Sequence, residues 1–553
     1  MSPTAPSRTR STSHRVLTAS AIVITAALAL SACTAPKDGS NTAAPNMELT
    51  ALTPAPSGDI DSFTWSSYAE PYSLDYAYAF DYADNQVLSN ICDSLLRWNA
   101  DLTTSPGLAE SYSNPTPTTW VYDIRSGVTF HDGTPLTAAD VVASLSRHLD
   151  PAIGSFWYTV YQNVTSIEQT GDMQVTVTTS IPDSQFNQAM ASSPGVVESA
   201  ATLAAAGTEY GNSSTGVNCT GPFSFGSWQA GESITLERYD DYWDADLTAK
   251  SAEVKFVFLT DPNARINAFK SGEVDGGWMV PSNAIAQLSS SGAGKMYFGT
   301  NTAVSNLVVG DLTGTLADVR VRQALLMAID RKGLISAAEQ GYATPTDAMT
   351  TESVWVGADQ ATVDSAFGDL KEYPYDLDAA KKLIEEAGVS GEELTIATAP
   401  ISASFSVIAQ ATAAAATAIG LKPTIETLTP NKYTTLFSDP SAREGVDLFY
   451  TSWYLSTADP LEMYGVLRTG EFSNYGGWSN PEFDEIVTNA VSIADPAARA
   501  VESAKAQAIA NQELPWLPLY EAPTVLWLGK NITGVAPSIN FLYYPWAATI
   551  GAS

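Results

Sequence analysis

The chain has 553 residues, of which 45% are hydrophobic and 16% charged, with 37 glycines and 31 prolines. It is too long for one core and too apolar to be disordered, so we expect two or three packed units. The 27 basic against 60 acidic residues give a net charge of −33, which excludes nucleic acid as a partner because like charges repel. Three histidines and three cysteines make a metal site or a disulfide-framework fold improbable, and no cofactor is expected.

The amino terminus has the order of a bacterial secretion signal. Arg8, Arg10 and Arg15 precede an uncharged run over 16–30 that is too short, as a helix, to cross a bilayer comfortably. Small residues then lead into Cys33, which looks like a lipobox, where the cysteine becomes the first mature residue and carries the lipid. An ordinary signal peptide with a chance cysteine is the alternative. We expect a signal peptide over 1–32, then the lipidated Cys33 and a flexible tether, together 33–60.

Beyond the tether, helical and strand patterns alternate without a repeat, which predicts a mixed α/β chain. Thr137 and Asp140 have capping-box spacing and predict the start of a helix. Alternating or β-rich strand patterns occupy 120–125, 128–130, 172–179, 234–238 and 254–259. Helical spacing is clearest over 318–339, 377–387, 404–419 and 496–513.

Common enzyme motifs are missing. The sequence has no Gly-x-Ser-x-Gly elbow, no phosphate-binding glycine loop, no His-Glu-x-x-His and no Cys-x-x-Cys. His131 and Asp132 could form an acid–base pair, but they sit in a hairpin-turn motif, so we favour a structural role. We therefore expect a protein that is not an enzyme.

A series of strings spreads over nearly the whole mature chain. The longest runs from Trp120 to Val142 and includes the Phe-His-Asp-Gly-Thr-Pro-Leu-Thr segment. Others follow in order at 109–112, 220–223, 236–243, 271–275, 318–330 and 515–520. With these strings the chain resembles the bacterial extracellular solute-binding proteins of family 5, which serve peptide, nickel and related ABC importers.

The resemblance implies a periplasmic-binding-protein type 2 fold of the α/β class, with two lobes and an additional inserted domain (cluster C-like). Ligand would bind in the cleft between the lobes, which close over it. The expected inserted domain is 98–181, and the second lobe is 298–520. The first lobe would combine 61–97, 182–297 and 521–553.

The resemblance also implies ligand contacts. In the second lobe they would come from the segment 450–460, and in the first lobe from Phe80, Asp81, Tyr82 and Trp278. The second-lobe residues are Ser452, Trp453, Tyr454, Ser456 and Asp459.

One position departs from the peptide-binding relatives. Three residues after the tryptophan they have an Asp that pairs with the α-amine of the ligand, and this chain has Ser456 there. Asp459 matches only a later acidic position of the motif. Either another acid pairs with the amine, or the ligand lacks that amine. Asp81 could be that acid, and the alternative for Asp81 is an ordinary solvated turn carboxylate.

Cys92 and Cys219 remain once Cys33 is assigned to the lipid. On an exported chain we expect them to form a disulfide within the first lobe, with buried free thiols as the alternative.

The expected function is that of a lipid-anchored receptor on the extracytoplasmic face of the cell membrane. As a monomer it would capture an oligopeptide or peptide-like solute and deliver it to the permease subunits of an ABC importer. An oligosaccharide receptor of the same family is the alternative, because sugar faces stack on aromatic rings and Ser456 is neutral. From another class, a secreted hydrolase is disfavoured by the missing nucleophile motif.

Overall fold

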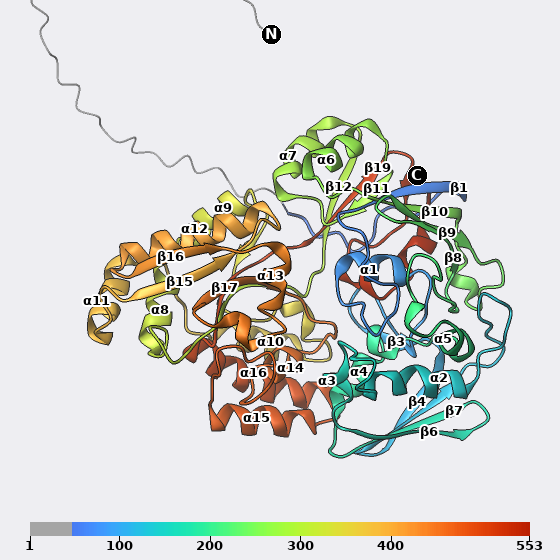
Figure 1. The fold of residues 1–553 in the computed structure, drawn as a ribbon, viewed down its shortest axis with the longest axis horizontal. Helices are drawn as coiled ribbons and strands as arrows, with labels where there is room; N and C mark the ends of the chain where they lie inside the picture. Colours follow the sequence, from blue (N-terminus) through green and yellow to red (C-terminus); the bar gives the residue numbers. More distant parts are fainter. Residues whose placement is uncertain (1–46) are drawn as a thin grey trace, which may run out of the picture. The chain divides into compact units, whose positions relative to one another are not determined.

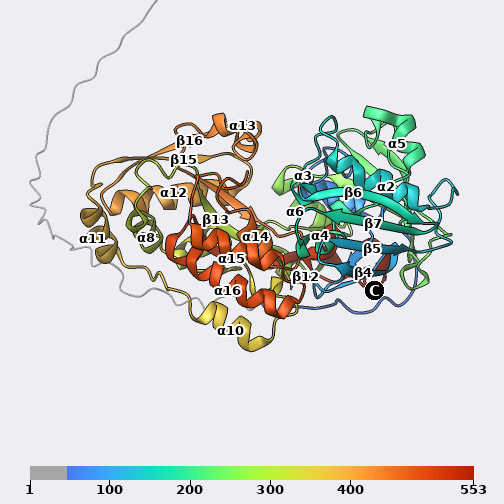
Figure 2. The same ribbon diagram turned by 90° about the horizontal axis from the view of Figure 1, so that it is seen from below.

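The computed structural model describes residues 47–553, so Cys33 and the expected signal peptide lie outside the described residues. Helices and strands alternate along the chain, and the strands gather into three main sheets. Two of these sheets lie on opposite sides of the molecule in Figures 1 and 2, each with its own helices. No helix among the described residues is long and apolar enough to span a membrane.

The first lobe is built on a seven-stranded sheet in the order β12-β19-β11-β1-β10-β9-β8. Strand β1 runs parallel to its neighbours β10 and β11, whereas the other pairs are antiparallel. The strands are β1 (Ile60–Ser67), β8 (Phe223–Gln229), β9 (Ser233–Arg238), β10 (Ser251–Phe258), β11 (Gly276–Trp278), β12 (Gly294–Gly299) and β19 (Thr524–Gly529). Its helices are α1 (Tyr82–Leu88), α4 (Ser184–Ala189), α5 (Ala200–Ala206), α6 (Pro262–Ser271) and α7 (Ser282–Ser291).

The second lobe is built on a six-stranded sheet in the order β14-β18-β13-β17-β15-β16. The strands are β13 (Val304–Val309), β14 (Thr344–Pro345), β15 (Glu393–Thr398), β16 (Lys422–Thr427), β17 (Leu448–Trp453) and β18 (Trp516–Glu521). The helices are α8 (Val319–Ala328), α9 (Arg331–Ala338), α10 (Gln360–Gly368), α11 (Leu377–Ala387), α12 (Ala403–Ala418), α13 (Pro430–Thr435), α14 (Leu461–Gly465), α15 (Pro481–Val491) and α16 (Pro496–Glu513).

A four-stranded antiparallel sheet, in the order β4-β5-β7-β6, adjoins the first lobe. Strand β5 buries Trp120, Tyr122 and Ile124 and leaves the alternate residues half-buried, as its period-two pattern predicts. The sheet and its helices comprise β4 (Ala109–Thr116), β5 (Thr119–Ile124), β6 (Val164–Gly171), β7 (Gln174–Thr179), α2 (Ala138–Ser146) and α3 (Tyr158–Tyr161). Two small ribbons pair β2 (Leu96–Trp98) with β3 (Thr104–Pro106) and β20 (Ile532–Thr533) with β21 (Gly551–Ala552).

Two of the predicted elements differ in the structure. The helix expected over 318–339 is two helices, because Ile329 is extended and the Asp330 carboxylate caps α9 by accepting from the Gly333 N–H at 3.0 Å. The segment 128–130 is not a regular strand but forms one bridge, Thr129 with Pro135, because the chain turns back at Gly133, where φ is 81°. Helices α11 and α16 have the predicted bounds.

Two short crossing segments join the lobes. Residues 300–303 lead from β12 to β13, and 522–523 lead from β18 to β19. They are hydrogen-bonded to each other, since Asn301 Nδ2 donates to the Ala522 carbonyl at 2.9 Å and Thr524 Oγ1 to the Thr300 carbonyl at 2.7 Å. The two crossings therefore form one connected hinge.

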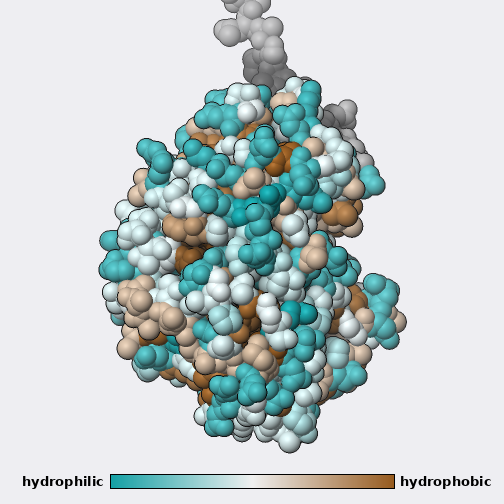
Figure 3. Space-filling view, turned by 90° about the vertical axis from the view of Figure 1, so that its right-hand side faces the viewer, coloured by the Kyte–Doolittle hydropathy of each residue, from teal (hydrophilic) through white to brown (hydrophobic). Residues whose placement is uncertain are grey.

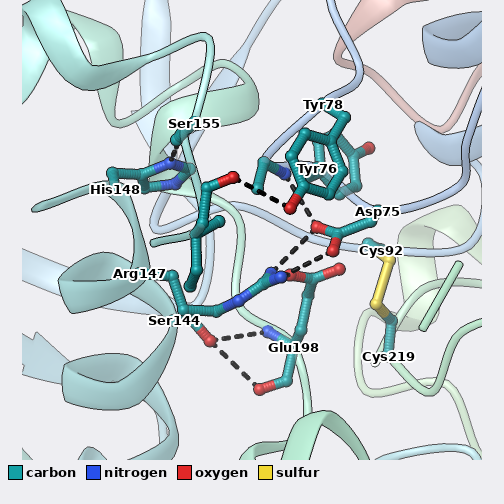
Figure 4. A network of polar contacts seen from close by, with 12 residues as sticks. Asp75, Tyr76, Tyr78, Cys92, Ser144, Arg147, His148, Ser155, Glu198 and Cys219 are labelled. Atoms are coloured by element: carbon teal, nitrogen blue, oxygen red, sulfur yellow. Dashed lines mark hydrogen bonds and ion pairs between the residues drawn. A yellow bond between two sulfur atoms is a disulfide. The ribbon is translucent and has the colours of Figure 1, made fainter. Parts of the chain in front are cut away.

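A buried ion-pair network fastens the four-stranded sheet to the first lobe (Figure 4). Arg147, just after α2, donates to both oxygens of Asp75 at 2.9 and 2.5 Å and to Glu198 Oε2 at 2.8 Å. The Ser144 hydroxyl also bonds both backbone groups of Glu198, at 3.0 and 2.9 Å. Burial and the nearby Asp75 charge raise the pKa of Glu198, and the Arg147 guanidinium opposes that shift.

The surface of the first lobe and the four-stranded sheet is mixed in polarity. On the face seen in Figure 3, hydrophobic residues are scattered among hydrophilic ones. The largest side chains lie inside instead, among them Trp65, Trp278 and Trp546, whose rings contact one another at centroid distances of 4.5 to 5.6 Å.

A disulfide joins Cys92 to Cys219 across a sequence separation of 127 residues (Figure 4). The four-stranded sheet lies within the loop that it closes. In the chain-entropy account a loop of this length stabilises the folded state by about 4 to 5 kcal/mol, and measured values are often smaller.

The Cys92→Ser/Cys219→Ser double variant should therefore have a free energy of unfolding, measured by urea denaturation, that is lower by up to about 4 to 5 kcal/mol. Labelling of both thiols in the oxidised, exported wild type would contradict the pairing.

A second buried ion pair holds the helices of the second lobe. Asp459 Oδ2 accepts from Arg499 Nε at 2.7 Å, and both side chains are almost fully buried. Arg499 also donates to the carbonyls of Ile493 and Ala494. Removing one partner of such a pair leaves an uncompensated buried charge.

Asp459→Ala should therefore lower the free energy of unfolding by about 3 to 5 kcal/mol, measured by urea denaturation. The matched control is Glu471→Ala, which removes a carboxylate from the more exposed pair with Arg468 and should cost about 1 kcal/mol or less. If both variants lose the same free energy of unfolding, the buried pair stabilises the protein no more than the exposed one.

Candidate functional site

A direct contact between the lobes brings three of the nine expected ligand-contact residues together. Tyr454 follows β17 in the second lobe, and its hydroxyl donates to the Phe80 carbonyl of the first lobe at 2.5 Å. Its ring lies 5.1 Å from that of Tyr82, which starts α1. The Tyr543 hydroxyl approaches the Tyr454 hydroxyl at 3.5 Å. Tyr454 thus makes a polar and an aromatic contact across the hinge.

The Phe80 side chain continues this contact towards the four-stranded sheet. It is 43% exposed, and its ring lies 4.7 Å from that of Phe156, which is 52% exposed. The Phe156 N–H donates to the Ala77 carbonyl at 2.9 Å, so the loop before α3 is bound to the Phe80 loop. Aromatic surface therefore remains open beside the interlobe contact.

Asp81 lies between Phe80 and Tyr82, but its carboxylate already has partners. It caps α1 by accepting from the Tyr82 N–H at 2.7 Å, and both oxygens accept from the Tyr68 hydroxyl, at 2.8 and 2.9 Å. Burial raises the pKa of Asp81, and these hydrogen bonds oppose the shift. The carboxylate therefore caps α1 and holds the Tyr68 hydroxyl.

Ser456 belongs to a compact polar turn. The Ser456 hydroxyl and N–H both donate to Glu462 Oε1 at 2.9 Å. The Thr457 hydroxyl and N–H donate to Glu462 Oε2, at 2.6 and 2.7 Å. All four donors therefore converge on one carboxylate within the segment. Nearby, Asp459 is held by Arg499 and by the Leu461 N–H, so it is not free either.

The remaining expected contacts lie in three different settings. Ser452 is exposed at the end of β17, whereas Trp453, on the other face of that strand, packs its ring against Trp516 at 5.3 Å. Trp278 is 1% exposed and stacks on Phe541 at 4.5 Å inside the first lobe. The structure does not bring these three together with Tyr454 and Phe80, and a ligand contact by any of the nine stays a prediction.

A group of hydroxyls surrounds Glu339, which follows α9. Glu339 Oε1 accepts from the Tyr520 hydroxyl at 2.8 Å and from the Ser404 hydroxyl at 3.1 Å. The Tyr450 and Ser305 hydroxyls lie 3.1 Å apart on the neighbouring strands. The partners are up to 181 residues apart, so only the i, i+2 alternation of Tyr450 and Ser452 could have pointed to this face.

Two further features do not build a reactive site. His131 Nε2 lies 3.0 Å from the Gly221 carbonyl, and Asp132 Oδ1 accepts from the Thr134 N–H and hydroxyl, so each has its own structural partner. Residues 47–553 contain no group of three His, Cys, Asp or Glu side chains that could hold a metal ion.

A groove of about 810 Å³ opens on the second lobe, away from the expected contacts. It is lined in part by Arg322, Trp478 and Glu513, which already bond one another or nearby carbonyls. None of the nine expected contact residues lines it.

The comparisons with known proteins agree on one family. The model for bacterial extracellular solute-binding proteins, family 5 Middle, matches residues 103–475. The glutathione-binding protein GsiB of Escherichia coli (strain K12) is 26% identical over 481 residues, covering 85% of this chain and 91% of the relative. GsiB of Shigella dysenteriae matches with the same figures.

Solved structures show the same fold. The periplasmic binding protein DppA of Helicobacter pylori, in complex with the peptide STSA, has a TM-score of 0.77 at 21% identity and covers 90% of this chain and 98% of its own. The oligopeptide-binding protein AppA of Bacillus subtilis, in complex with a nonapeptide, has a TM-score of 0.76 at 20% identity, covering 90% and 100%. These relatives are binding proteins and not enzymes. The α/β fold is the expected two-lobe one, and the chain belongs to the bacterial extracellular solute-binding proteins of family 5.

Proposed function

We propose that this protein is the lipid-anchored receptor of an ABC importer and captures a peptide or peptide-like solute between its two lobes. The observation that carries the proposal is the contact of Tyr454 with Phe80 and Tyr82 across a hinge of two short crossings. A ligand that touches both lobes binds the closed arrangement more tightly than the open one and therefore shifts the equilibrium towards closure.

The solute class is supported by the relatives. GsiB is named for glutathione, itself a peptide, and DppA and AppA are bound to a tetrapeptide and a nonapeptide. The neutral Ser456 and the exposed rings of Phe80 and Phe156 are also compatible with an oligosaccharide, which is the second candidate.

The division of the chain is part of the proposal. We assign 61–97, 182–297 and 521–553 to the first lobe, 98–181 to the inserted domain and 298–520 to the second lobe. Apart from the first residue of β1 and the last two residues of β12, the seven-stranded sheet takes its strands from the first set, and the six-stranded sheet lies within 298–521. The proposed permease would receive the solute when the hinge opens.

A binding panel tests the solute class. The purified protein is titrated by calorimetry with reduced glutathione, the peptide STSA, a nonapeptide and maltotriose, and each ligand is recovered for mass spectrometry. Binding of at least one peptide, recovered unchanged, is expected. Binding of maltotriose alone would replace the peptide proposal with the oligosaccharide one, and a cleaved ligand would overturn the receptor assignment.

Tyr454→Phe tests the interlobe contact in the same assay. The hydroxyl bond to Phe80 forms only when the lobes are together, so its loss should weaken peptide binding about 2- to 12-fold, as expected for 0.5 to 1.5 kcal/mol. The matched control is Tyr161→Phe, which removes a buried hydroxyl bonded to the Pro194 carbonyl. That control should lower the free energy of unfolding and leave affinity unchanged. The same affinity loss in both variants would contradict the role of Tyr454.

The lipid anchor is tested through Cys33. Two acyl chains, at about 0.8 kcal/mol per buried CH₂, would hold the protein stably on a membrane. Cys33→Ser should therefore appear in the medium or the soluble extracytoplasmic fraction, with peptide affinity unchanged. If the variant stays with washed membranes as fully as the wild type, the lipid anchor is wrong.

A further inference from the structure

Glu339 combines partial exposure with an incomplete set of hydrogen bonds. Both bonds to its carboxylate, from Tyr520 and Ser404, end on Oε1. Among the described residues, no hydrogen bond reaches Oε2 and no Lys or Arg forms an ion pair with the side chain. One oxygen of a carboxylate that is fixed by two hydroxyls is therefore free to accept a bond from something else.

Glu339 directly follows α9, whose last residue contacts the first lobe. The Ser282 hydroxyl, at the start of α7 in the first lobe, donates to the carbonyl of the preceding residue, Ala338, at 3.0 Å. A hydrogen bond from the Ser282 hydroxyl would lower the pKa of Glu339 against the larger raising effect of burial, but the single proton of that hydroxyl is donated to the Ala338 carbonyl. In the second lobe, the Tyr450 and Tyr520 hydroxyls also lie beside the Glu339 carboxylate. The free oxygen thus belongs to a carboxylate that both lobes flank.

Four acids near the contact of Tyr454 with Phe80 are less suited to hold a cation. Asp81 caps α1 and holds Tyr68, Asp459 pairs with Arg499, and Glu462 accepts four hydrogen bonds. Asp84 has an unpartnered oxygen but is 1% exposed, and burial together with the Asp81 charge raises its pKa to about 8, so it is largely neutral at pH 7. Asp81 and Glu462 are partly exposed like Glu339, but of these acids only Glu339 combines that exposure with an oxygen that no hydrogen bond reaches.

From this geometry we infer that Glu339 anchors an ammonium group of the bound solute. The inference rests on the proposed function, since it names the group by which a peptide is recognised. Ammonium donates in three directions, and Oε2 of Glu339 together with the Tyr450, Ser452 and Ser404 hydroxyls offers acceptors. The ammonium could be the peptide's own amino terminus or a lysine side chain.

The experiment uses two random tetrapeptide libraries, one with free and one with acetylated amino termini. Each is incubated with the wild type, with Glu339→Gln and with Glu393→Gln, and the captured peptides are quantified by mass spectrometry. Glu393 is an exposed acid at the start of β15, so its variant controls for the loss of one negative charge on the same lobe. Thermal unfolding of each variant is recorded alongside.

The wild type and Glu393→Gln should capture free-amine peptides about ten- to a hundredfold more strongly than acetylated ones, and Glu339→Gln should lose that preference. Acetylated peptides that are captured only when they contain lysine, and are lost in Glu339→Gln, would support the ammonium with lysine as its source. Equal capture of both libraries by the wild type, without lysine enrichment, overturns the inference even if Glu339→Gln does not fold. A folded Glu339→Gln that keeps the preference overturns it as well. If the folded wild type captures neither library, the proposed function itself fails.

Discussion

The two hydrogen bonds between the crossing segments determine how the lobes can move. Asn301 and Thr524 bind each crossing to the other, and the Asn301 carbonyl also accepts from the hydroxyls of Thr351 and Ser353 in the second lobe, at 3.2 and 2.6 Å. Because the crossings are so short and are joined, the lobes can change their relation mainly by rotating about this one place. Rotation about the crossings would therefore make or break the contact of Tyr454 with Phe80.

Such a hinge is useful only if each lobe is stiff. In the first lobe, Trp65, Trp278 and Trp546 contact one another in the core, and Phe541 stacks on Trp278. Close-packed aromatic rings allow little internal adjustment. The Arg147 network adds the four-stranded sheet to this body, and the pair of Asp459 with Arg499 fixes the turn after β17 in the second lobe. The easiest motion is therefore a rotation of the lobes about the crossings, and a ligand that binds both lobes can shift this equilibrium.

The sequence predicts structural features that depend on neighbouring residues better than features that depend on residues far apart in the chain. The bounds of α11 and α16 follow from helical spacing with local caps, since Asp376 and Asp495 each bond an N–H three residues on. Asp330 also caps a helix with its carboxylate, but the helical spacing of apolar residues continues across this position, so the sequence pattern does not reveal the break. Asp459 pairs with Arg499, 40 residues further along the chain, and no local pattern reports such a pair. The hydroxyls that bond Glu339 likewise belong to residues 65 and 181 positions away.

Ser456 belongs to a turn that is closed by its own hydrogen bonds. Its hydroxyl and N–H donate to Glu462, which also holds both donors of Thr457. A carboxylate at position 456 would place a second negative charge against Glu462, whose pKa burial already raises. A hydroxyl therefore suits this turn better than an acid would. Because Glu462 and Asp459 both have partners within the second lobe, a cation that binds beside this segment needs a carboxylate outside it, and partly exposed Glu339 is the one that we infer.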